Sequence, residues 1–134
     1  MKVAIIGSRD FTDYKYMLDC ILKTVVVSEI DCIVSGGARG ADTLAEFFAM
    51  SCNIPTMIFK ADWNKFGKAA GFIRNTQIVE NSDIVLAFPI GESKGTYDSI
   101  AKAKKLNKQV FIFRKEISDA WKDCWAFNME VIHI

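Results

Sequence analysis

Glycine, hydroxyl and basic residues recur at four places where a short apolar run ends. They are Gly7-Ser8-Arg9-Asp10, residues 35–42, residues 60–63 and residues 89–96. The second of these, Ser35-Gly36-Gly37-Ala38-Arg39-Gly40-Ala41-Asp42, comes just before a stretch with helical periodicity. Glycines let backbone N–H groups approach an anion closely, and the N-terminus of a helix adds partial positive charge. This loop is therefore a candidate phosphate site, and residues 91–96 repeat the arrangement after the fourth apolar run.

Residues 35–42 match neither of two common phosphate-binding motifs. Ser35 stands at the first glycine position of the dinucleotide fingerprint G-x-G-x-x-G, and the loop follows the second apolar run instead of the first. It is not a Walker loop either. The structural alternative is that the three glycines only make a tight turn between a strand and a helix.

Basic residues in or just after these loops could bind the charge of a phosphate. They are Arg9, Arg39, Lys65, Lys68 and Arg74. Each one taken alone is better explained as a solvated surface charge, but residues 60–74 hold four basic residues against Asp62 alone. Trp63 in the same segment could stack on a base or cover the edge of the sheet. The lysines in residues 102–108 are interpreted as a solvated helix face, with Asp98 and Lys102 as an ion pair one turn apart.

The elements that must position these residues alternate along the chain. Residues 3–6, 32–34, 56–59, 84–88 and 110–113 are short apolar runs typical of strands buried on both faces. Residues 14–28, 41–52, 68–81 and 96–106 are long enough for helices and are patterned as helices. The alternation predicts one doubly wound α/β domain over residues 1–134, with a parallel sheet.

The loops that leave the predicted strands differ from the loops that enter them. The entering segments 28–31, 53–55 and 107–109 contain no glycine. Because ligands of such sheets bind beyond the carboxyl ends of the strands, this difference places a site at that edge. The tail, residues 117–134, is expected to begin as a helix and fold back on the sheet, and residues 131–134 could add an edge strand.

The composition excludes several classes of function. Histidine occurs once, as His133, which excludes His-based triads and paired-His metal sites. The four cysteines form no C-x-x-C pair, so we expect reduced, buried thiols. The net charge of +1 argues against a protein that mainly coats nucleic acid or anionic membranes, and no stretch approaches 18 apolar residues. We therefore expect a cytoplasmic protein without a metal site, a cofactor, a membrane or a nucleic-acid partner.

Four strings of residues resemble the YspA-like branch of the SLOG (SMF/DprA-LOG) superfamily over residues 2–113. They are Gly7-Ser8-Arg9-Asp10-Phe11, residues 35–42, Ala61-Asp62-Trp63 with Gly67-Lys68-Ala69-Ala70-Gly71 and Arg74-Asn75, and Gly95-Thr96. The resemblance implies a Rossmann-like fold that binds nucleotides or nucleotide-derived ligands, in a branch common in bacteria and phages. It is consistent with a five-stranded, mainly parallel sheet in the order 3-2-1-4-5.

The superfamily also contains the LONELY GUY phosphoribohydrolases, which use an arginine on one helix and a glutamate in P-G-G-x-G-T-x-x-E. The resemblance assigns the arginine to Arg74, but Ser99 stands at the glutamate position and leaves Asp98 as the nearby carboxylate. Cleavage of an N-glycosidic bond needs a carboxylate to stabilise the oxocarbenium ion or activate water. Asp10 or Glu92 could substitute for it.

We expect the protein to bind a nucleotide or nucleotide-derived small molecule through these loops, and to form a homodimer as similar proteins do. The alternatives are a nucleoside 5'-monophosphate phosphoribohydrolase, an N-glycosidase that releases free base and ribose 5-phosphate, and a simple interaction module. The candidate catalytic residues are Arg74 and Asp98, and no residue is assigned to a metal. The candidate ligand-binding residues are Gly7, Ser8, Arg9, Ser35, Gly36, Gly37, Arg39, Gly40, Asp42, Trp63, Lys68, Gly95 and Thr96.

Overall fold

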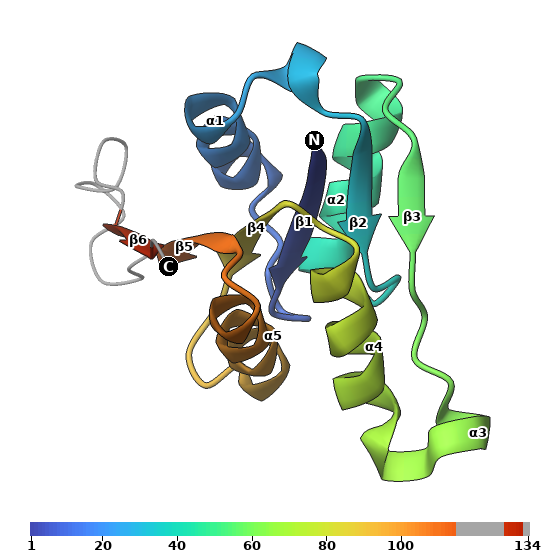
Figure 1. The fold of residues 1–134 in the computed structure, drawn as a ribbon. Helices are drawn as coiled ribbons and strands as arrows, with labels where there is room; N and C mark the ends of the chain where they lie inside the picture. The colour runs from blue at the N-terminus through green and yellow to red at the C-terminus, as the bar shows by residue number, and fades with distance from the viewer. Residues whose placement is uncertain (115–127, 133–134) are drawn as a thin grey trace.

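The computed structural model describes residues 1–114 and 128–132, which form a twisted sheet with helices on both faces (Figure 1). The strands are β1 (Lys2–Gly7), β2 (Cys32–Ser35), β3 (Thr56–Ile58), β4 (Ile84–Phe88), β5 (Gln109–Arg114) and β6 (Asn128–Ile132). They lie in the order β3-β2-β1-β4-β5-β6. The first five are parallel, which confirms the predicted order 3-2-1-4-5.

The C-terminal tail adds a strand at the edge of the sheet. Strand β6 pairs antiparallel with β5, so that Phe111 lies opposite Val131. The predicted edge strand is thus present, although it spans Asn128–Ile132 instead of residues 131–134. The predicted helical start of the tail lies outside the described residues.

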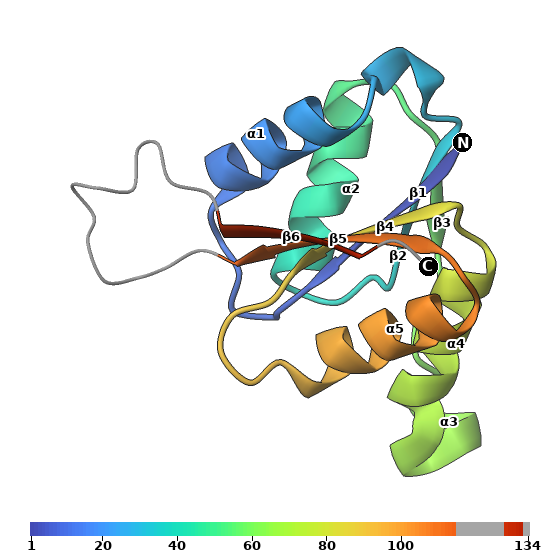
Figure 2. The same cartoon turned by 60° about the vertical axis from the view of Figure 1, so that its left-hand side comes forward.

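Helices cover both faces of the sheet (Figure 2). Helices α1 (Tyr14–Thr24) and α2 (Ala41–Ser51) lie on one face, and α4 (Ala70–Glu80) and α5 (Lys94–Lys105) on the other. Alternate strand residues divide between two buried clusters, so that Ile5 packs with the α1 and α2 cluster and Ile6 with the α4 and α5 cluster. Burial on both faces explains why the strands are continuous apolar runs. Within the described part of the chain, no helix is long and apolar enough to cross a membrane.

Helix boundaries follow local sequence signals. Asp13 caps α1, because its carboxylate accepts a hydrogen bond of 3.0 Å from the Tyr16 N–H. The helix ends at Thr24, four residues earlier than predicted, where a run of three β-branched valines at 25–27 begins. Asn53 and Asn107, at the glycine-free turns after α2 and α5, have positive φ angles of 54° and 58°. Asparagine is one of the few residues other than glycine that tolerate this conformation.

The segment between β3 and α4 is more ordered than the sequence indicates. It contains the short helix α3 (Trp63–Phe66) and a 3₁₀ turn (Gly67–Ala69), which extend beyond the sheet (Figure 1). Asp62 caps α3 by accepting a hydrogen bond of 3.1 Å from the Lys65 N–H. The sequence did not predict this helix, because four residues are too few to show hydrophobic periodicity.

Gly40 allows the loops after β1 and β2 to pack directly against each other. Its φ angle is 76°, and a Cβ placed there would lie 2.4 Å from the carbonyl oxygen of Arg9 and 2.5 Å from that of Ser8. The same contact brings the Ala41 N–H within 3.1 Å of the Ser8 carbonyl oxygen. Gly40 is therefore required for packing between two backbones as well as for its own conformation.

We expect Gly40→Ala to destabilise the protein more than Gly91→Ala. Both glycines have positive φ, but a Cβ on Gly91 would meet nothing within 4 Å. Left-handed backbone costs an L-residue roughly 1–2 kcal/mol, which applies to both variants. Forced movement of packed groups adds about 1–3 kcal/mol for Gly40→Ala alone. Urea unfolding would measure the difference, and equal losses in the two variants would contradict the packing role of Gly40.

Candidate functional site

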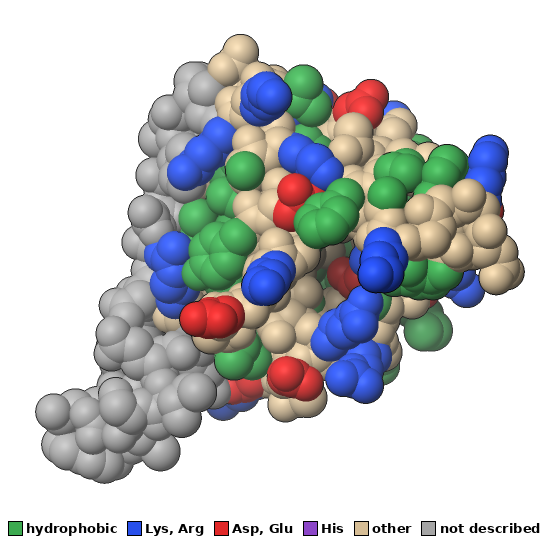
Figure 3. Space-filling model, turned by 90° about the horizontal axis from the view of Figure 1, so that it is seen from below, with side chains coloured by type: hydrophobic (Ala, Val, Ile, Leu, Met, Phe, Trp, Pro, Cys, Tyr) green, Lys and Arg blue, Asp and Glu red, His purple; other side chains and the backbone are tan. Residues whose placement is uncertain are grey.

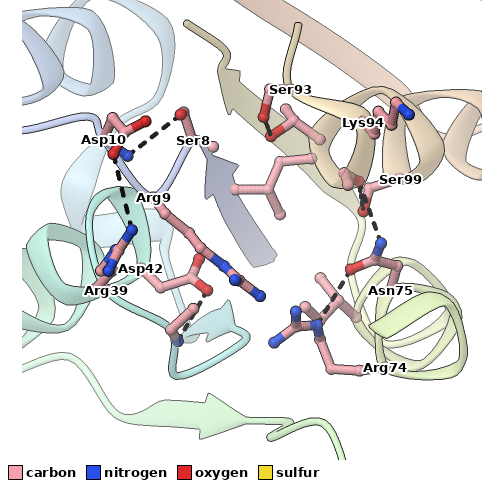
Figure 4. Close-up of a pocket in the computed structure, with 16 residues that line it drawn as sticks. Ser8, Arg9, Asp10, Arg39, Asp42, Arg74, Asn75, Ser93, Lys94 and Ser99 are labelled. Carbon is pink, nitrogen blue, oxygen red and sulfur yellow. Dashed lines mark hydrogen bonds and ion pairs between the residues drawn. The ribbon is translucent and has the colours of Figure 1, made fainter. Parts of the chain in front are cut away.

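A cavity of about 320 Å³ opens at the carboxyl ends of β1 and β4. The strand order reverses between these two strands, which is where ligands of open α/β sheets bind. The lining comes from the loop after β1, residues 38–42, helix α4 and the start of α5 (Figure 4). The two predicted phosphate loops, residues 35–42 and 91–96, therefore do meet at one cavity.

The Arg74 side chain is half-buried and held in a fixed direction. Its Nη1 donates a hydrogen bond of 2.8 Å to the Gly36 carbonyl oxygen, and its Nε donates one of 3.2 Å to Oδ1 of Asn75. An arginine has five N–H donors. The remaining donors of Arg74 have no partner among the described residues, so they can bind a ligand in the cavity.

Asn75 orients Arg74 and connects helix α4 to α5. It is only 7% exposed, and its Nδ2 donates to the Gly95 carbonyl oxygen at 3.2 Å and to Oδ2 of Asp98 at 3.1 Å. Its side chain is thus engaged on both sides. Asn75 belongs to one of the strings that resemble the family, but it had no predicted role. Its burial next to Arg74 could not be inferred from the sequence, because it depends on tertiary contacts.

Two guanidinium groups converge on the cavity from opposite sides. Figure 4 shows the Arg9 side chain extending from the loop after β1 toward Arg74 on α4. Burial lowers the pKa of Arg74, the carboxylate of Asp42 opposes this shift, and the charge of Arg9 adds to it. Two like charges in one partly buried space favour an anion between them.

Asp42, in the first turn of α2, is the buried carboxylate of the cavity. It is 8% exposed, and its Oδ2 accepts a hydrogen bond of 3.1 Å from the Ala38 N–H. Burial raises the pKa of Asp42, while the Ala38 N–H, the charge of Arg74 and the nearby Ser35 hydroxyl act in the opposite direction. Its charge partly balances the two arginines.

Helices α2 and α5 both begin at the cavity without a side-chain cap. Gly40 precedes α2 and has no side chain, and Ser93 precedes α5 without a capping hydrogen bond. The Ser93 hydroxyl instead lies 2.6 Å from the Thr96 hydroxyl. The first N–H groups of a helix have no partner within it, and the helix dipole favours negative charge there. Both helix starts thus add to the positive potential of the cavity.

The cavity contains only part of the predicted ligand set. The predicted residues in its lining are Gly7, Ser8, Arg9, Arg39, Asp42, Arg74, Gly95 and Thr96. Those outside the lining are Ser35, Gly36, Gly37, Gly40, Trp63, Lys68 and Asp98. Lining residues that had no assigned ligand role are Ile6, Asp10, Ala38, Asn75, Ile78, Ser93, Lys94 and Ser99.

The glycines after β2 allow close packing behind the cavity wall. A Cβ on Gly36 would lie 2.6 Å from Nη1 of Arg74 and 2.9 Å from Oδ2 of Asp42. The absence of a side chain at Gly36 thus lets the arginine and the carboxylate approach the loop backbone. The same loop also contributes Ala38, Arg39 and Asp42 to the lining.

Asp98 faces helix α4 and its own helix. Its Oδ2 accepts hydrogen bonds from Lys102 Nζ at 2.8 Å and from Asn75 Nδ2 at 3.1 Å. The predicted ion pair between Asp98 and Lys102 is confirmed. The carboxylates in the cavity lining are Asp10 and Asp42, and residues 1–114 hold no cluster of three or more potential metal ligands.

Comparisons with known proteins agree with this architecture. The model of the YspA, cpYpsA-related SLOG family matches residues 1–66. Gene 61 protein of Mycobacterium phage D29 is 35% identical over 119 residues, which cover 84% of this chain and 95% of that protein.

Two solved structures share the fold at 23% identity each. DNA processing protein A from Helicobacter pylori superposes with a TM-score of 0.66, over 89% of this chain and 67% of that one. The Streptococcus pneumoniae protein of the same name has a TM-score of 0.70 over 91% of this chain, which spans about half (53%) of its length.

The expectation that nucleic acid is not a partner needs correction. The structure from Helicobacter pylori is described for its unique single-stranded DNA binding mode. A protein with this fold thus binds nucleic acid. The overall net charge of +1 was the wrong measure, because binding depends on local charge.

We expect Asp42→Asn to remove a pH dependence of stability. Because the folded state raises the pKa of Asp42, it holds that proton more tightly than the unfolded chain does. The quantity of interest is the free energy of unfolding of the wild type minus that of Asp42→Asn. This difference is greatest below about pH 4, the ordinary pKa of an aspartate, and it falls as pH rises through the folded-state pKa of Asp42. Urea unfolding of both proteins from pH 3 to 7 measures this difference. A difference that grows with pH would show that attraction to Arg74 outweighs burial.

Proposed function

The chain belongs to the YspA, cpYpsA-related SLOG family, and from this and from the cavity we propose that it binds a nucleotide or nucleotide-derived ligand by its phosphate. The observation that carries the proposal is the Arg74 guanidinium, which the Gly36 carbonyl and Asn75 hold in place while further donors stay free. A planar guanidinium with adjacent free donors suits bidentate binding of a phosphate. Arg9 and the uncapped starts of α2 and α5 add positive potential at the same place.

The phosphate has two chemical sources. One is a free mononucleotide, and the other is the phosphate of a single-stranded nucleic acid, the ligand class of the Helicobacter pylori protein. The 5'-terminal phosphate of such a strand is a monoester like that of a mononucleotide, so it would present the same group to Arg9 and Arg74. The cavity volume of about 320 Å³ accommodates a ligand of roughly nucleotide size, since ligand pockets start at about 300 Å³.

Binding has stronger support than phosphoribohydrolase activity. The carboxylate assigned to that chemistry, Asp98, is engaged by Asn75 and Lys102 and does not line the cavity. Asp10 lines the cavity, but its carboxylate is exposed and lies 4.0 Å from Arg39. Asp42 also lines the cavity, but its carboxylate is buried and accepts the Ala38 N–H.

We expect Arg74→Ala to weaken AMP binding about 10-fold to 150-fold. A charge-assisted hydrogen bond contributes roughly 1.5–3 kcal/mol, which corresponds to that range of affinity. Arg74→Lys should recover only part of it, because a lysine cannot bind in the bidentate manner. Titration calorimetry with AMP measures the affinities.

The matched control is Lys104→Ala, which removes an exposed positive charge on α5 outside the cavity lining. It should leave AMP affinity unchanged, and thermal unfolding should show that both variants are folded. Equal affinity of the wild type and Arg74→Ala for AMP would contradict the proposed role of the arginine. Failure of the wild type to bind AMP or any phosphorylated nucleotide would overturn the function.

We expect binding without release of the base. Incubation with each of the common nucleoside 5'-monophosphates, followed by chromatography, should show neither free base nor ribose 5-phosphate. Asp98→Asn should leave AMP affinity within a few-fold, because Asp98 contacts Lys102 and Asn75 and not the cavity. Base release by the wild type that disappears in Asp98→Asn would instead establish the hydrolase.

A further inference from the structure

A second cavity of about 370 Å³ lies beside the first and shares Arg74 with it. Its walls are the end of β3, the segment 59–62 that follows it, and helices α3 and α4. Figure 3 views the face at which the parallel strands end, where basic side chains gather with acidic ones between them. Arg74 is thus the border between two neighbouring spaces on one face of the molecule.

The second cavity has an excess of positive charge. Lys60, Lys65 and Arg74 line it, against a single lining carboxylate, Asp62. The Asp62 carboxylate accepts the Lys65 N–H at the start of α3. Among the described residues, neither Lys60 nor Lys65 forms an ion pair with a carboxylate, so both ammonium groups can attract an anion from solution.

Aromatic side chains stand at the same place. Phe66 lines the second cavity at 39% exposure, and Trp63 on the same short helix is 53% exposed. Lys65 Nζ lies 5.1 Å from the centre of the Phe66 ring. Proteins that bind single-stranded nucleic acid combine such groups: a base stacks on the exposed ring, and the nearby cation binds the phosphate.

Residues 63–69, which form α3 and the 3₁₀ turn after it, contribute no buried residue to the core. Neither α3 nor the following 3₁₀ turn contains a buried residue, although the segment includes two large aromatic residues. Stability of the sheet therefore does not explain these side chains. Exposed apolar groups concentrated beside a charged cavity are typical of a binding surface.

We propose that the second cavity binds the next nucleotide of a phosphodiester-linked ligand, with its phosphate near Lys65 and its base against Phe66. This inference rests on the proposed function, since the terminal phosphate occupies the first cavity at Arg9 and Arg74. Arg74, which lines both cavities, lies between the two nucleotides. The ligand class is then a 5'-phosphorylated dinucleotide unit, either free or at the end of a single strand.

The test compares AMP with the 5'-phosphorylated dinucleotide pApA by calorimetry on the full chain. The wild type should bind pApA about 100-fold more tightly than AMP, because a second charged contact and a stacked base each contribute about 10-fold and these factors multiply. Lys65→Ala and Phe66→Ala should each weaken pApA binding by about 10-fold or more and leave AMP affinity unchanged. Both side chains are exposed, so thermal unfolding should change little.

Lys104→Ala is again the matched control, because Lys104 is an exposed lysine that lines neither cavity. It should bind both probes as the wild type does. Equal affinity of the wild type for AMP and pApA, or equal losses of pApA binding in Lys65→Ala and Lys104→Ala, would overturn the inference while leaving the AMP site intact. If the wild type binds neither AMP nor pApA, the proposed function itself is wrong.

A 5'-phosphorylated single-stranded DNA pentamer distinguishes a free dinucleotide ligand from the end of a nucleic-acid strand. Binding that is as tight as that of pApA or tighter, and that depends on Lys65, supports the end of a strand. Lys65-dependent binding of pApA alone supports a free dinucleotide.

Discussion

The reversal of strand order at β1 determines where a ligand site can form. The chain leaves β1 toward α1 on one face of the sheet and leaves β4 toward α5 on the other face (Figure 2). The two connections diverge because parallel crossovers are right-handed and extend in opposite directions from this pair of strands. The space that remains at the carboxyl ends of β1 and β4 is the first cavity, and every segment that lines it is placed there by the sheet.

Helix register then determines which α4 side chains reach that space. Ile78 is buried in the cluster beneath the sheet, and Arg74 lies one turn before it on the same side of the helix. Packing of Ile78 therefore directs Arg74 toward the loop after β2, where the Gly36 carbonyl oxygen accepts its Nη1 hydrogen. Asn75, the next residue, is turned toward α5. One buried isoleucine thus links the stability of the core to the orientation of the guanidinium.

The fold could be predicted from the sequence because strands buried on both faces leave a simple signal, whereas the direction of single side chains could not. Asp98 and Ser99 are neighbours, yet one helical residue turns the direction by about 100°. Ser99 lines the cavity, and Asp98 faces Lys102 and Asn75.

The glycines show a related limit of sequence analysis. A glycine that lets a ligand approach and one that lets a neighbouring chain segment approach have the same sequence signature. Gly36 is of the second kind, since a Cβ would meet Arg74 and Asp42. Lys68 and Trp63 were assigned to the first site from their position along the chain, but Trp63 lies on α3 and Lys68 in the 3₁₀ turn after it, and neither lines the first cavity.

The error about nucleic acid has a physical cause that also bears on how this site works. A protein that coats a duplex neutralises many phosphates and needs a large excess of basic residues. A cavity that holds one or two phosphates needs only a local excess, and Arg9, Arg39, Arg74 and Lys94 line the first cavity with Asp10 and Asp42. The remaining acidic residues balance the net charge elsewhere on the molecule. A chain with a net charge of +1 can therefore present a distinctly positive site, because the local potential depends on the distribution of charge and not on its total.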